Sequence, residues 1–471
     1  MRFREGINRK GTFPLVSDGF NCPCDFFFAF ASENAHRHNN LLSFLTLRIR
    51  EISLLFVSTQ SGGMEIIMEY ISGGVCAAKG FKAAGIHAGI RKNKSKKDLA
   101  LIISEKRATA AAAYTLNLVK GAPIYVTKEN IEDGYAQAVI CNSGNANTCN
   151  ANGIEIANEM CALVEKHTGI SKNDVIVAST GVIGQPLSIE PIENAMESLT
   201  KGLSYEGGGD AAEAIMTTDT AEKEVAFSFE IGGKTCKMGG IAKGSGMIHP
   251  NMATMLVFIT TDVAITPEML QKALSKDVKS SFNMLSIDGD TSTNDMVSIM
   301  ANGMAENPLI DSEGEGFDTF CEVLSAVTST LCRKIAKDGE GATKMLECRV
   351  SGACDTENAK IVAKSVICSS LFKAAMFGAD ANWGRILCAI GYSGAKLDVD
   401  KVAVWLESAE GEIFVCENGS GVEFDEETAK KVLSEDEIVI RIKLGDGDGS
   451  AVAWGCDLTY DYVKINGDYR T

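Results

Sequence analysis

A glycine-rich polar loop places a threonine at the start of an apolar strand. The loop runs from Gly239 to Thr254, and the strand after it reads Met-Leu-Val-Phe-Ile over residues 255–259. A hydroxyl held at this junction suits self-cleavage of the Ala253–Thr254 bond, which would free the α-amine of Thr254 as a base for its own hydroxyl. On the pattern alone an ordinary loop before a core strand is the better interpretation, because such turns are common.

Six separated segments, taken together, change that balance. From about Gly80 onward the chain resembles the ornithine acetyltransferase family of arginine biosynthesis, the bifunctional glutamate N-acetyltransferases. One short match would be weak, whereas six in family order up to the last residue are specific. The segments are Gly80-Phe81-Lys82-Ala83-Ala84-Gly85, Asn142-Ser143-Gly144-Asn145-Ala146-Asn147, Ser179-Thr180-Gly181-Val182-Ile183-Gly184, the Thr254 loop, Asp338-Gly339-Glu340-Gly341-Ala342-Thr343-Lys344 and Ile465-Asn466-Gly467-Asp468-Tyr469-Arg470-Thr471.

The resemblance implies a glutamate N-acetyltransferase that is cut between Ala253 and Thr254. N2-acetylornithine would acylate Thr254 and leave as ornithine, and glutamate would then accept the acetyl group in a ping-pong cycle. Many family members also use acetyl-CoA as donor; no nucleotide pocket is legible in this sequence, so that donor stays open. No metal and no bound cofactor are expected. Two copies of each fragment are expected to assemble as a heterotetramer.

The resemblance also assigns residues to an oxyanion hole and to substrate binding. Thr180 and Gly181 would form the oxyanion hole, since a hydroxyl and a backbone N–H at a glycine turn can converge on one developing negative charge. Without the resemblance, an ordinary strand-ending turn is the better interpretation. The substrate-binding residues carried over are Thr217, Lys243, Thr254, Glu340, Asn466 and Thr471.

The types of these residues suit an amino-acid ligand. Lys243 can meet a carboxylate and Glu340 an ammonium, which makes them the minimum complementary pair, although each charge alone is more often a solvated surface residue. Thr217 is followed by Thr218, so its assignment is uncertain by one position. Asn466 and Thr471 would otherwise be a frayed tail. The resemblance implies that this tail folds back into the site.

Composition is that of a globular enzyme with an acidic surface. The chain has 471 residues, 45% of them hydrophobic, and a formal net charge of -17, which argues against binding to a phosphate backbone. Its 15 cysteines are scattered without a Cys-x-x-Cys motif, which favours reduced thiols in a cytoplasm. Cys368 and Cys388 lie in apolar runs and are expected to be buried. No apolar run is long enough for a transmembrane helix.

Residues 1–63 differ from the rest of the chain. They carry seven Lys/Arg against five Asp/Glu, and their apolar segment is interrupted by Arg48, Arg50 and Glu51. A secretory signal would have a cleaner apolar core, and a transit peptide would usually avoid acidic residues. We therefore expect an extension outside the fold, with Met64 or Met68 as natural starts, and a cytoplasmic location in preference to a mitochondrial matrix.

The pattern of apolar residues predicts alternating strands and helices, a layered α/β protein with helices on a mixed sheet. Strands are expected at 98–104, 136–141 and 175–177, and hairpins around Gly232-Gly233 and 409–411. Helices are expected at 154–167, after Ser188 through about Leu199, at 317–337, at 357–372 with Thr356 as cap, and from Thr266-Pro267 onward.

The family resemblance implies an ornithine acetyltransferase-type fold, similar to the N-terminal-nucleophile enzymes, and the chain is expected to have three parts. The parts are the extension 1–63, an alpha chain 64–253 with the oxyanion hole, and a beta chain 254–471 with the nucleophile and the C-terminal tail. Cleavage is expected to divide one interlocked fold without releasing a domain. The alternatives are an N-terminal-threonine amidohydrolase or aminopeptidase, in which water replaces glutamate, and a non-catalytic binding protein that would remain a single uncut chain.

Overall fold

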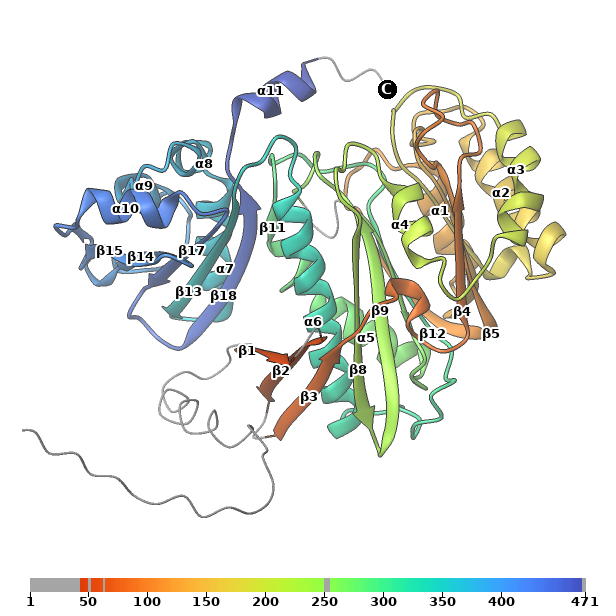
Figure 1. Cartoon of the computed structure of the whole chain (residues 1–471), viewed down its shortest axis with the longest axis horizontal. Helices are drawn as coiled ribbons and strands as arrows, with labels where there is room; N and C mark the ends of the chain where they lie inside the picture. The colour runs from red at the N-terminus through yellow and green to blue at the C-terminus, as the bar shows by residue number, and fades with distance from the viewer. Residues whose placement is uncertain (1–42, 50–51, 62–63, 250–254, 468–471) are drawn as a thin grey trace, which may run out of the picture. The chain divides into compact units, whose positions relative to one another are not determined.

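Two β-sheets with helices packed around them make up the described part of the chain. The computed structural model describes residues 43–49, 52–61, 64–249 and 255–467, which belong to one compact unit beginning at Ser43. Figure 1 shows the larger sheet in the middle of this unit and the smaller one to its left, coloured blue. The mixed α/β class predicted from the sequence is therefore confirmed.

The larger sheet contains eleven of the described strands. Its order is β1-β2-β3-β8-β9-β10-β12-β5-β6-β7, and β4 pairs with β5 beside this path. The strands are β1 (Ser43–Ile49), β2 (Ile52–Ser61), β3 (Met64–Tyr70), β4 (Phe81–Ile86), β5 (Leu99–Tyr114), β6 (Tyr135–Asn142), β7 (Val175–Ser179), β8 (Lys223–Ile231), β9 (Lys234–Lys243), β10 (Leu256–Thr261) and β12 (Met296–Ala301).

The smaller sheet comes from the C-terminal part of the chain. Its order is β11-β18-β13-β17-β14-β15-β16. The strands are β11 (Leu285–Ser286), β13 (Met345–Ala353), β14 (Ala403–Ser408), β15 (Gly411–Glu417), β16 (Ser420–Gly421), β17 (Glu437–Lys443) and β18 (Gly449–Cys456). The helices of both layers are α1 (Ala122–Asn130), α2 (Gly153–Thr168), α3 (Glu190–Lys201), α4 (Gly208–Ile215), α5 (Pro267–Asp277), α6 (Glu315–Lys337), α7 (Thr356–Cys368), α8 (Ser370–Phe377), α9 (Trp383–Gly391), α10 (Glu426–Leu433) and α11 (Tyr460–Asn466).

Strands from the two sides of residue 254 alternate within the larger sheet. β10 is hydrogen-bonded to β9 on one side and to β12 on the other, and β12 pairs in turn with β5. β10 and β12 therefore lie between β9 and β5, which both precede residue 254 in the chain. A cut in the loop between β9 and β10 would leave these ladders of backbone hydrogen bonds in place.

Local sequence signals account for several elements. Gly232 and Gly233 both have positive φ, at 57° and 74°, which is the geometry of a two-residue hairpin turn between β8 and β9. The hydroxyl of Thr266 accepts a hydrogen bond from the Met269 N–H and caps α5, with Pro267 in its first turn. The second predicted hairpin is present as β14 and β15, with Ser408 opposite Gly411. These predictions are confirmed.

Other boundaries differ from the prediction. The helix expected over 357–372 is divided at Ser369, whose hydroxyl accepts from the Phe372 N–H and caps the separate helix α8. Asp355, and not Thr356, caps α7, because its carboxylate accepts from the Asn358 N–H at 2.8 Å. β5 extends to Tyr114 through a run of alanines that packs between two helical layers, although alanine has low strand propensity.

Two cysteines and the segment before residue 62 differ from what the sequence predicted. Cys388 is exposed and Cys368 half-buried, so the prediction that both are buried was wrong; the helical period of α9 turns Ile386, Ala389 and Ile390 inward instead. Residues 43–49 and 52–61, placed in the extension by the sequence, are strands at the edge of the larger sheet: β2 pairs with β3, and β1 pairs with β2. None of the helices in the described residues is long and apolar enough to cross a membrane.

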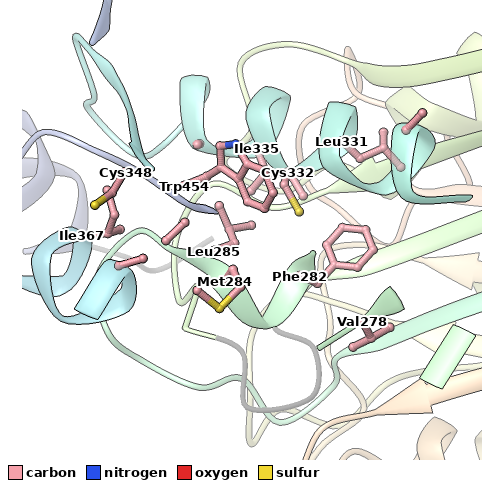
Figure 2. Close-up of a cluster of buried hydrophobic side chains, with 14 of the residues drawn as sticks. Val278, Phe282, Met284, Leu285, Leu331, Cys332, Ile335, Cys348, Ile367 and Trp454 are labelled. Carbon is pink, nitrogen blue, oxygen red and sulfur yellow. The ribbon is translucent and has the colours of Figure 1, made fainter. Parts of the chain in front are cut away.

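Helix α6 joins the cores of the two sheets. It packs against β8 and β9 of the larger sheet and against β13 and β18 of the smaller one. Figure 2 shows Leu331, Cys332 and Ile335 of this helix facing Trp454 of β18 and the Phe282 ring. These side chains are all nearly or fully buried, so the packing of one helix fixes the position of both sheets.

Leu331→Ala should therefore lower the free energy of unfolding by about 2–5 kcal/mol, because it removes buried methyl groups and leaves a cavity. Leu331 is 0% exposed, whereas Leu309 is 58% exposed and offers the same substitution at the surface. Leu309→Ala should change stability by less than about 0.5 kcal/mol. Urea denaturation followed by circular dichroism measures both, and equal effects would contradict the structural role of α6.

Candidate active site

Six residues predicted for the site line one small cavity. Its volume is about 120 Å³, and it lies where the ends of β7 and β9 meet the starts of β10 and β12. The predicted residues that line it are Thr180, Gly181, Thr217, Lys243, Glu340 and Asn466. Ala253, Thr254 and Thr471 lie outside the described residues, but Met255, which directly follows Thr254, also lines the cavity.

The Thr180–Gly181 turn is held by the neighbouring loop of Gly144 and Asn145. The Thr180 N–H donates to the Asn142 carbonyl at 3.0 Å, and the Val182 N–H donates to the Gly144 carbonyl at 3.3 Å. Gly181 has φ of 131°, and a Cβ there would lie 2.3 Å from the Gly144 carbonyl carbon. Only glycine therefore fits, and the turn presents the threonine and the glycine to the cavity.

Lys243 ends β9 beside a buried carboxylate. Its side chain is 8% exposed, and Asp219 is 3% exposed. Asp219 accepts hydrogen bonds from Lys223 Nζ at 2.7 Å, from the Gly244 N–H at 2.7 Å and from the Thr217 N–H at 2.9 Å. Burial by itself would raise the pKa of Asp219, but the charges of Lys243 and Lys223 and these hydrogen bonds hold it well below its usual range.

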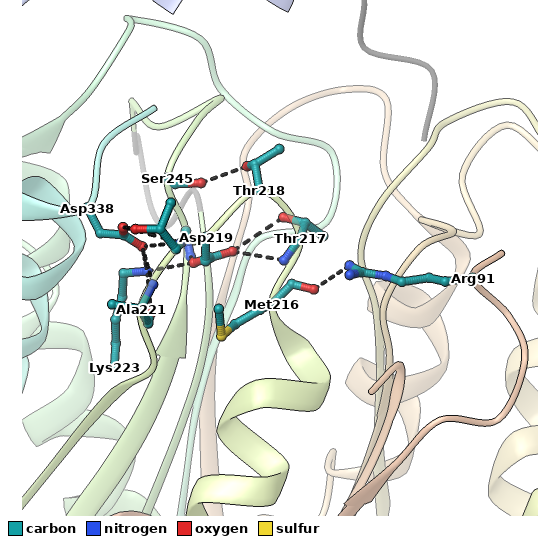
Figure 3. A network of polar contacts seen from close by, with 11 residues as sticks. Arg91, Met216, Thr217, Thr218, Asp219, Ala221, Lys223, Ser245 and Asp338 are labelled. Atoms are coloured by element: carbon teal, nitrogen blue, oxygen red, sulfur yellow. Dashed lines mark hydrogen bonds and ion pairs between the residues drawn. The ribbon is translucent and has the colours of Figure 1, made fainter. Parts of the chain in front are cut away.

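The same network reaches the loop that carries Glu340. Lys223 forms a second ion pair with Asp338, whose carboxylate also accepts from the Thr220 N–H at 3.0 Å. Figure 3 shows Asp219 and Lys223 at the centre of these contacts, with Asp338 on one side and Thr217 on the other. Buried charges thus tie together the loop of Thr217, the end of β9 and the loop of Glu340.

Thr217 and Thr218 both line the cavity but have different partners. The Thr217 hydroxyl is 3.5 Å from Asp219 Oδ2, whereas the Thr218 hydroxyl is 2.7 Å from the Ser245 hydroxyl. Asp219 therefore fixes the backbone of the first threonine, and Ser245 fixes the side chain of the second. The two positions between which the sequence could not choose are both at the site.

Glu340 and Asn466 meet across the cavity. Asn466 Nδ2 donates to Glu340 Oε2 at 2.7 Å, although the two residues are 126 positions apart. Glu340 is 8% exposed, its N–H donates to the Ser245 carbonyl at 2.7 Å, and its carboxylate lies against Gly246, where a Cβ would meet it at 2.3 Å. The C-terminal helix α11 is thereby bonded to the site.

The segment before residue 250 is held by the loop after β11. Both oxygens of Asp288 accept from N–H groups of this segment, from Met247 at 2.6 Å and from Ile248 at 2.8 Å. The Thr291 hydroxyl donates to the His249 carbonyl at 2.8 Å. Burial and the charge of Lys364 lower the pKa of His249 to about 4, so its ring is neutral at pH 7. The chain that leads to Thr254 is therefore anchored on one side.

Comparison with known proteins shows the family of this chain. The ArgJ family matches residues 82–471. The chain belongs to the ArgJ family. It is 53% identical over 405 residues to the arginine biosynthesis bifunctional protein ArgJ of Caldanaerobacter subterraneus subsp. tengcongensis, covering 86% of this chain and 100% of that protein. It is 47% identical over 403 residues to ArgJ of Bacillus subtilis, covering 85% and 97%. ArgJ proteins are acetyltransferases of arginine biosynthesis, and this chain is one of them.

Two solved structures are also similar. The ArgJ protein of Bacillus halodurans is 44% identical, with 45% of this chain and 97% of that chain covered and a TM-score of 0.43. The ornithine acetyltransferase of Mycobacterium tuberculosis, solved with ornithine, is 34% identical, with 40% and 100% covered and a TM-score of 0.36.

The sequence missed one group of residues in the cavity. Ser292, Thr293, Asn294 and Asp295 line it from the loop before β12, and Asn294 Nδ2 donates to the Ser179 carbonyl at 3.0 Å, next to the Thr180 turn. A signal was present, because six polar residues in a row, Asp290 to Asp295, precede a buried strand. Spacing alone could not indicate that β10 and β12 are parallel neighbours with their starts side by side.

Asp219→Asn should lower the free energy of unfolding at pH 7 by about 3 kcal/mol, because it leaves buried lysine charges without their partner. The pKa of Asp219 is lower in the folded than in the unfolded chain, so its contribution is complete above about pH 4. It is lost as the pH falls from there towards the folded pKa. The difference between wild type and variant should therefore shrink below about pH 4 in urea titrations. Asp311→Asn, at an exposed position, should show no such difference.

Proposed function

We propose that this protein transfers the acetyl group of N2-acetylornithine to glutamate through an acetyl ester of Thr254. One observation carries the proposal: residues selected from separate segments of the sequence line a single cavity beside the start of β10. Met255 lines the same cavity, so the residue after the nucleophile is already at the site.

The charges of the cavity suit amino acids. Lys243 and Glu340 are each 8% exposed and have opposite charges, and charged side chains are rarely buried unless paired. An α-carboxylate would bind Lys243 and an ammonium would bind Glu340, which would compensate both. A volume of about 120 Å³ fits the end of an amino acid with its acetyl group, and larger donors would extend beyond it.

In the first half-reaction, the Thr254 hydroxyl attacks the acetyl carbonyl and the freed α-amine of Thr254 takes the hydroxyl proton. The Thr180 hydroxyl and the Gly181 N–H stabilise the oxyanion, and one such donor contributes roughly 3 kcal/mol. Ornithine leaves, and the amine of glutamate then attacks the acetyl ester. The product is N-acetylglutamate, and Thr254 is regenerated.

The α-amine is created by cleavage, so processing precedes catalysis. The Thr254 hydroxyl attacks the Ala253 carbonyl, the acyl group shifts from nitrogen to oxygen, and water hydrolyses the ester. The alternation of β9, β10, β12 and β5 supports the idea that the two fragments stay together, because separating them would break the sheet. By family resemblance, two copies of each fragment form a heterotetramer in the cytoplasm.

Thr254→Ala should yield one uncut chain without acetyltransferase activity, whereas the wild type should give fragments that end at Ala253 and start at Thr254. Denaturing electrophoresis with N-terminal sequencing and transfer of acetyl to labelled glutamate measure both properties. Thr235→Ala, at an exposed position of β9, is the matched control and should be cut and active. Normal cleavage of Thr254→Ala would remove Thr254 from both roles, and release of acetate without labelled product would favour an amidohydrolase.

A groove next to the reaction cavity supports the use of acetyl-CoA as a second acetyl donor. Gly181, Thr217 and Thr218 also line a larger cavity of about 580 Å³, whose other side carries Arg91, Lys92 and Lys96. The chain as a whole is acidic, so a cluster of cations next to the reaction cavity favours an anionic ligand. The phosphates of acetyl-CoA would lie here while the acetyl group enters the smaller cavity.

Lys92→Glu with Lys96→Glu should raise the KM for acetyl-CoA about tenfold or more and leave the KM for N2-acetylornithine within about twofold, because only the nucleotide donor carries phosphates. Lys94→Glu changes charge in the same segment at a residue outside the groove and is the control. Steady-state kinetics with each donor measure the constants. Equal effects of the double variant on both donors would contradict a nucleotide site.

A further inference from the structure

Asp295 is a buried carboxyl group in the reaction cavity to which neither the sequence nor the family resemblance gives a role. It is 2% exposed and stands one residue before β12. The Met296 N–H donates to the Met255 carbonyl at 2.9 Å, which sets Asp295 beside the start of β10. The Thr115 N–H donates to the Asp295 carbonyl at 3.1 Å and holds its backbone. The side chain thus reaches the cavity from a rigid part of the sheet.

One oxygen of this carboxyl, Oδ2, is buried and has no hydrogen-bond partner among the residues that the structure describes. Asp219, close by and 3% exposed, is the useful comparison, because its oxygens accept from Lys223, Gly244 and Thr217. Asp219 is a carboxylate stabilised for structure. Buried polar atoms are almost always paired, so an unpaired one that lines a cavity indicates a partner supplied by a ligand.

The two carboxyl groups also differ in their protonation. Burial raises the pKa of Asp295 well above its usual range, and the hydrogen bonds of Ser292 and Thr115 and the charge of Lys243 oppose this only in part. Asp295 therefore keeps its proton at pH values at which an ordinary aspartate has lost it. The other charged side chains of the described residues that line this cavity are Lys243 and Glu340.

We propose that Asp295 is a catalytic acid–base residue whose Oδ2 exchanges a proton with the substrate nitrogen during acetyl transfer. The inference rests on the proposed function, because it assumes that an amide nitrogen leaves the acetyl group in this cavity. The α-amine of Thr254 accepts the proton of the hydroxyl. The amide nitrogen of the donor must also be protonated to depart as an amine. Asp295 supplies that second proton.

The protons balance over both half-reactions. In the first, the C–O bond of acetyl-Thr254 forms and the C–N bond of the donor breaks. The Asp295 proton goes to the nitrogen and the hydroxyl proton goes to the α-amine, which leaves a carboxylate and an ammonium. In the second, the amine of the acceptor attacks, Asp295 takes a proton from its nitrogen, and the α-ammonium returns one to the Thr254 oxygen.

An ester donor separates this role from a structural one. The p-nitrophenolate of p-nitrophenyl acetate leaves without a proton, whereas ornithine leaves N2-acetylornithine only with one. Asp295→Asn keeps the shape but cannot supply the proton. It should lower the single-turnover rate with N2-acetylornithine about 100-fold or more. The burst of p-nitrophenolate should stay within about threefold of wild type. Equal losses with both donors, or no loss with the amide, would overturn the proposal.

Asp277→Asn is the matched control: a buried aspartate, 7% exposed and bonded to the Ser281 hydroxyl, that is exchanged in the same way but does not line the cavity. It should leave the ratio of the amide rate to the ester rate unchanged. The wild type tests the underlying function separately. It should give a burst of p-nitrophenolate, and peptide mass spectrometry should find an acetyl group on Thr254. If both are absent, the covalent mechanism fails, whatever the role of Asp295.

If Asp295→Asn remains uncut, the pH dependence of the wild type decides. The ratio of the amide rate to the ester rate should fall as the pH rises through the pKa of Asp295, because the acid form is then lost. Both rates are measured at saturating donor, so differences in substrate binding at Lys243 and Glu340 do not enter the ratio. A ratio that stays constant between about pH 5 and about pH 9 would refute the proposal.

Discussion

The site depends on the backbone hydrogen bonds that hold β10 between β9 and β12. The pairing places Lys243, the last residue of β9, opposite Leu256, and it places Leu256 beside Met296. Strand register alone therefore brings together three residues: Lys243, Met255 (which follows Thr254) and Asp295. Register errors of one residue would turn these side chains to the other face of the sheet, so the ladder specifies the chemistry as well as the fold.

Buried ion pairs then hold in place the loops that the sheet brings together. Asp219 and Lys223 are four positions apart, and Asp338 joins them from the end of α6. Each member is buried or nearly so, which would be unfavourable for any one of them alone. Because every carboxylate has a cationic partner, the network holds the loops of Thr217 and Glu340 in one arrangement. Lys243, at the edge of the network, is then available to a substrate carboxylate.

Local features of the fold were predictable from the sequence, and long-range features were not. Two glycines between alternating apolar runs predicted the hairpin of β8 and β9, and Thr266-Pro267 predicted the start of α5. The break at Ser369 was missed, because α7 and α8 share one apolar period. The alanine part of β5 is held by β12, which pairs with residues 109–114, and local propensity could not indicate this long-range contact. The site residues came from the family resemblance, whereas the contact between Glu340 and Asn466 depends on how α11 packs.

The packing of α11 bears on why such an enzyme transfers acetyl groups instead of hydrolysing them. An acetyl-threonine reacts with whichever nucleophile reaches it, so the outcome depends on whether water or an amine occupies the cavity. The cavity is small, about 120 Å³, so an amino acid bound in it displaces water. α11 covers one side through Asn466, and the Thr459 hydroxyl fixes its start by donating to the Gly341 carbonyl at 2.6 Å. The position of α11 depends on Glu340 through this hydrogen bond, so the carboxylate proposed to bind a substrate ammonium also holds the helix that covers the cavity.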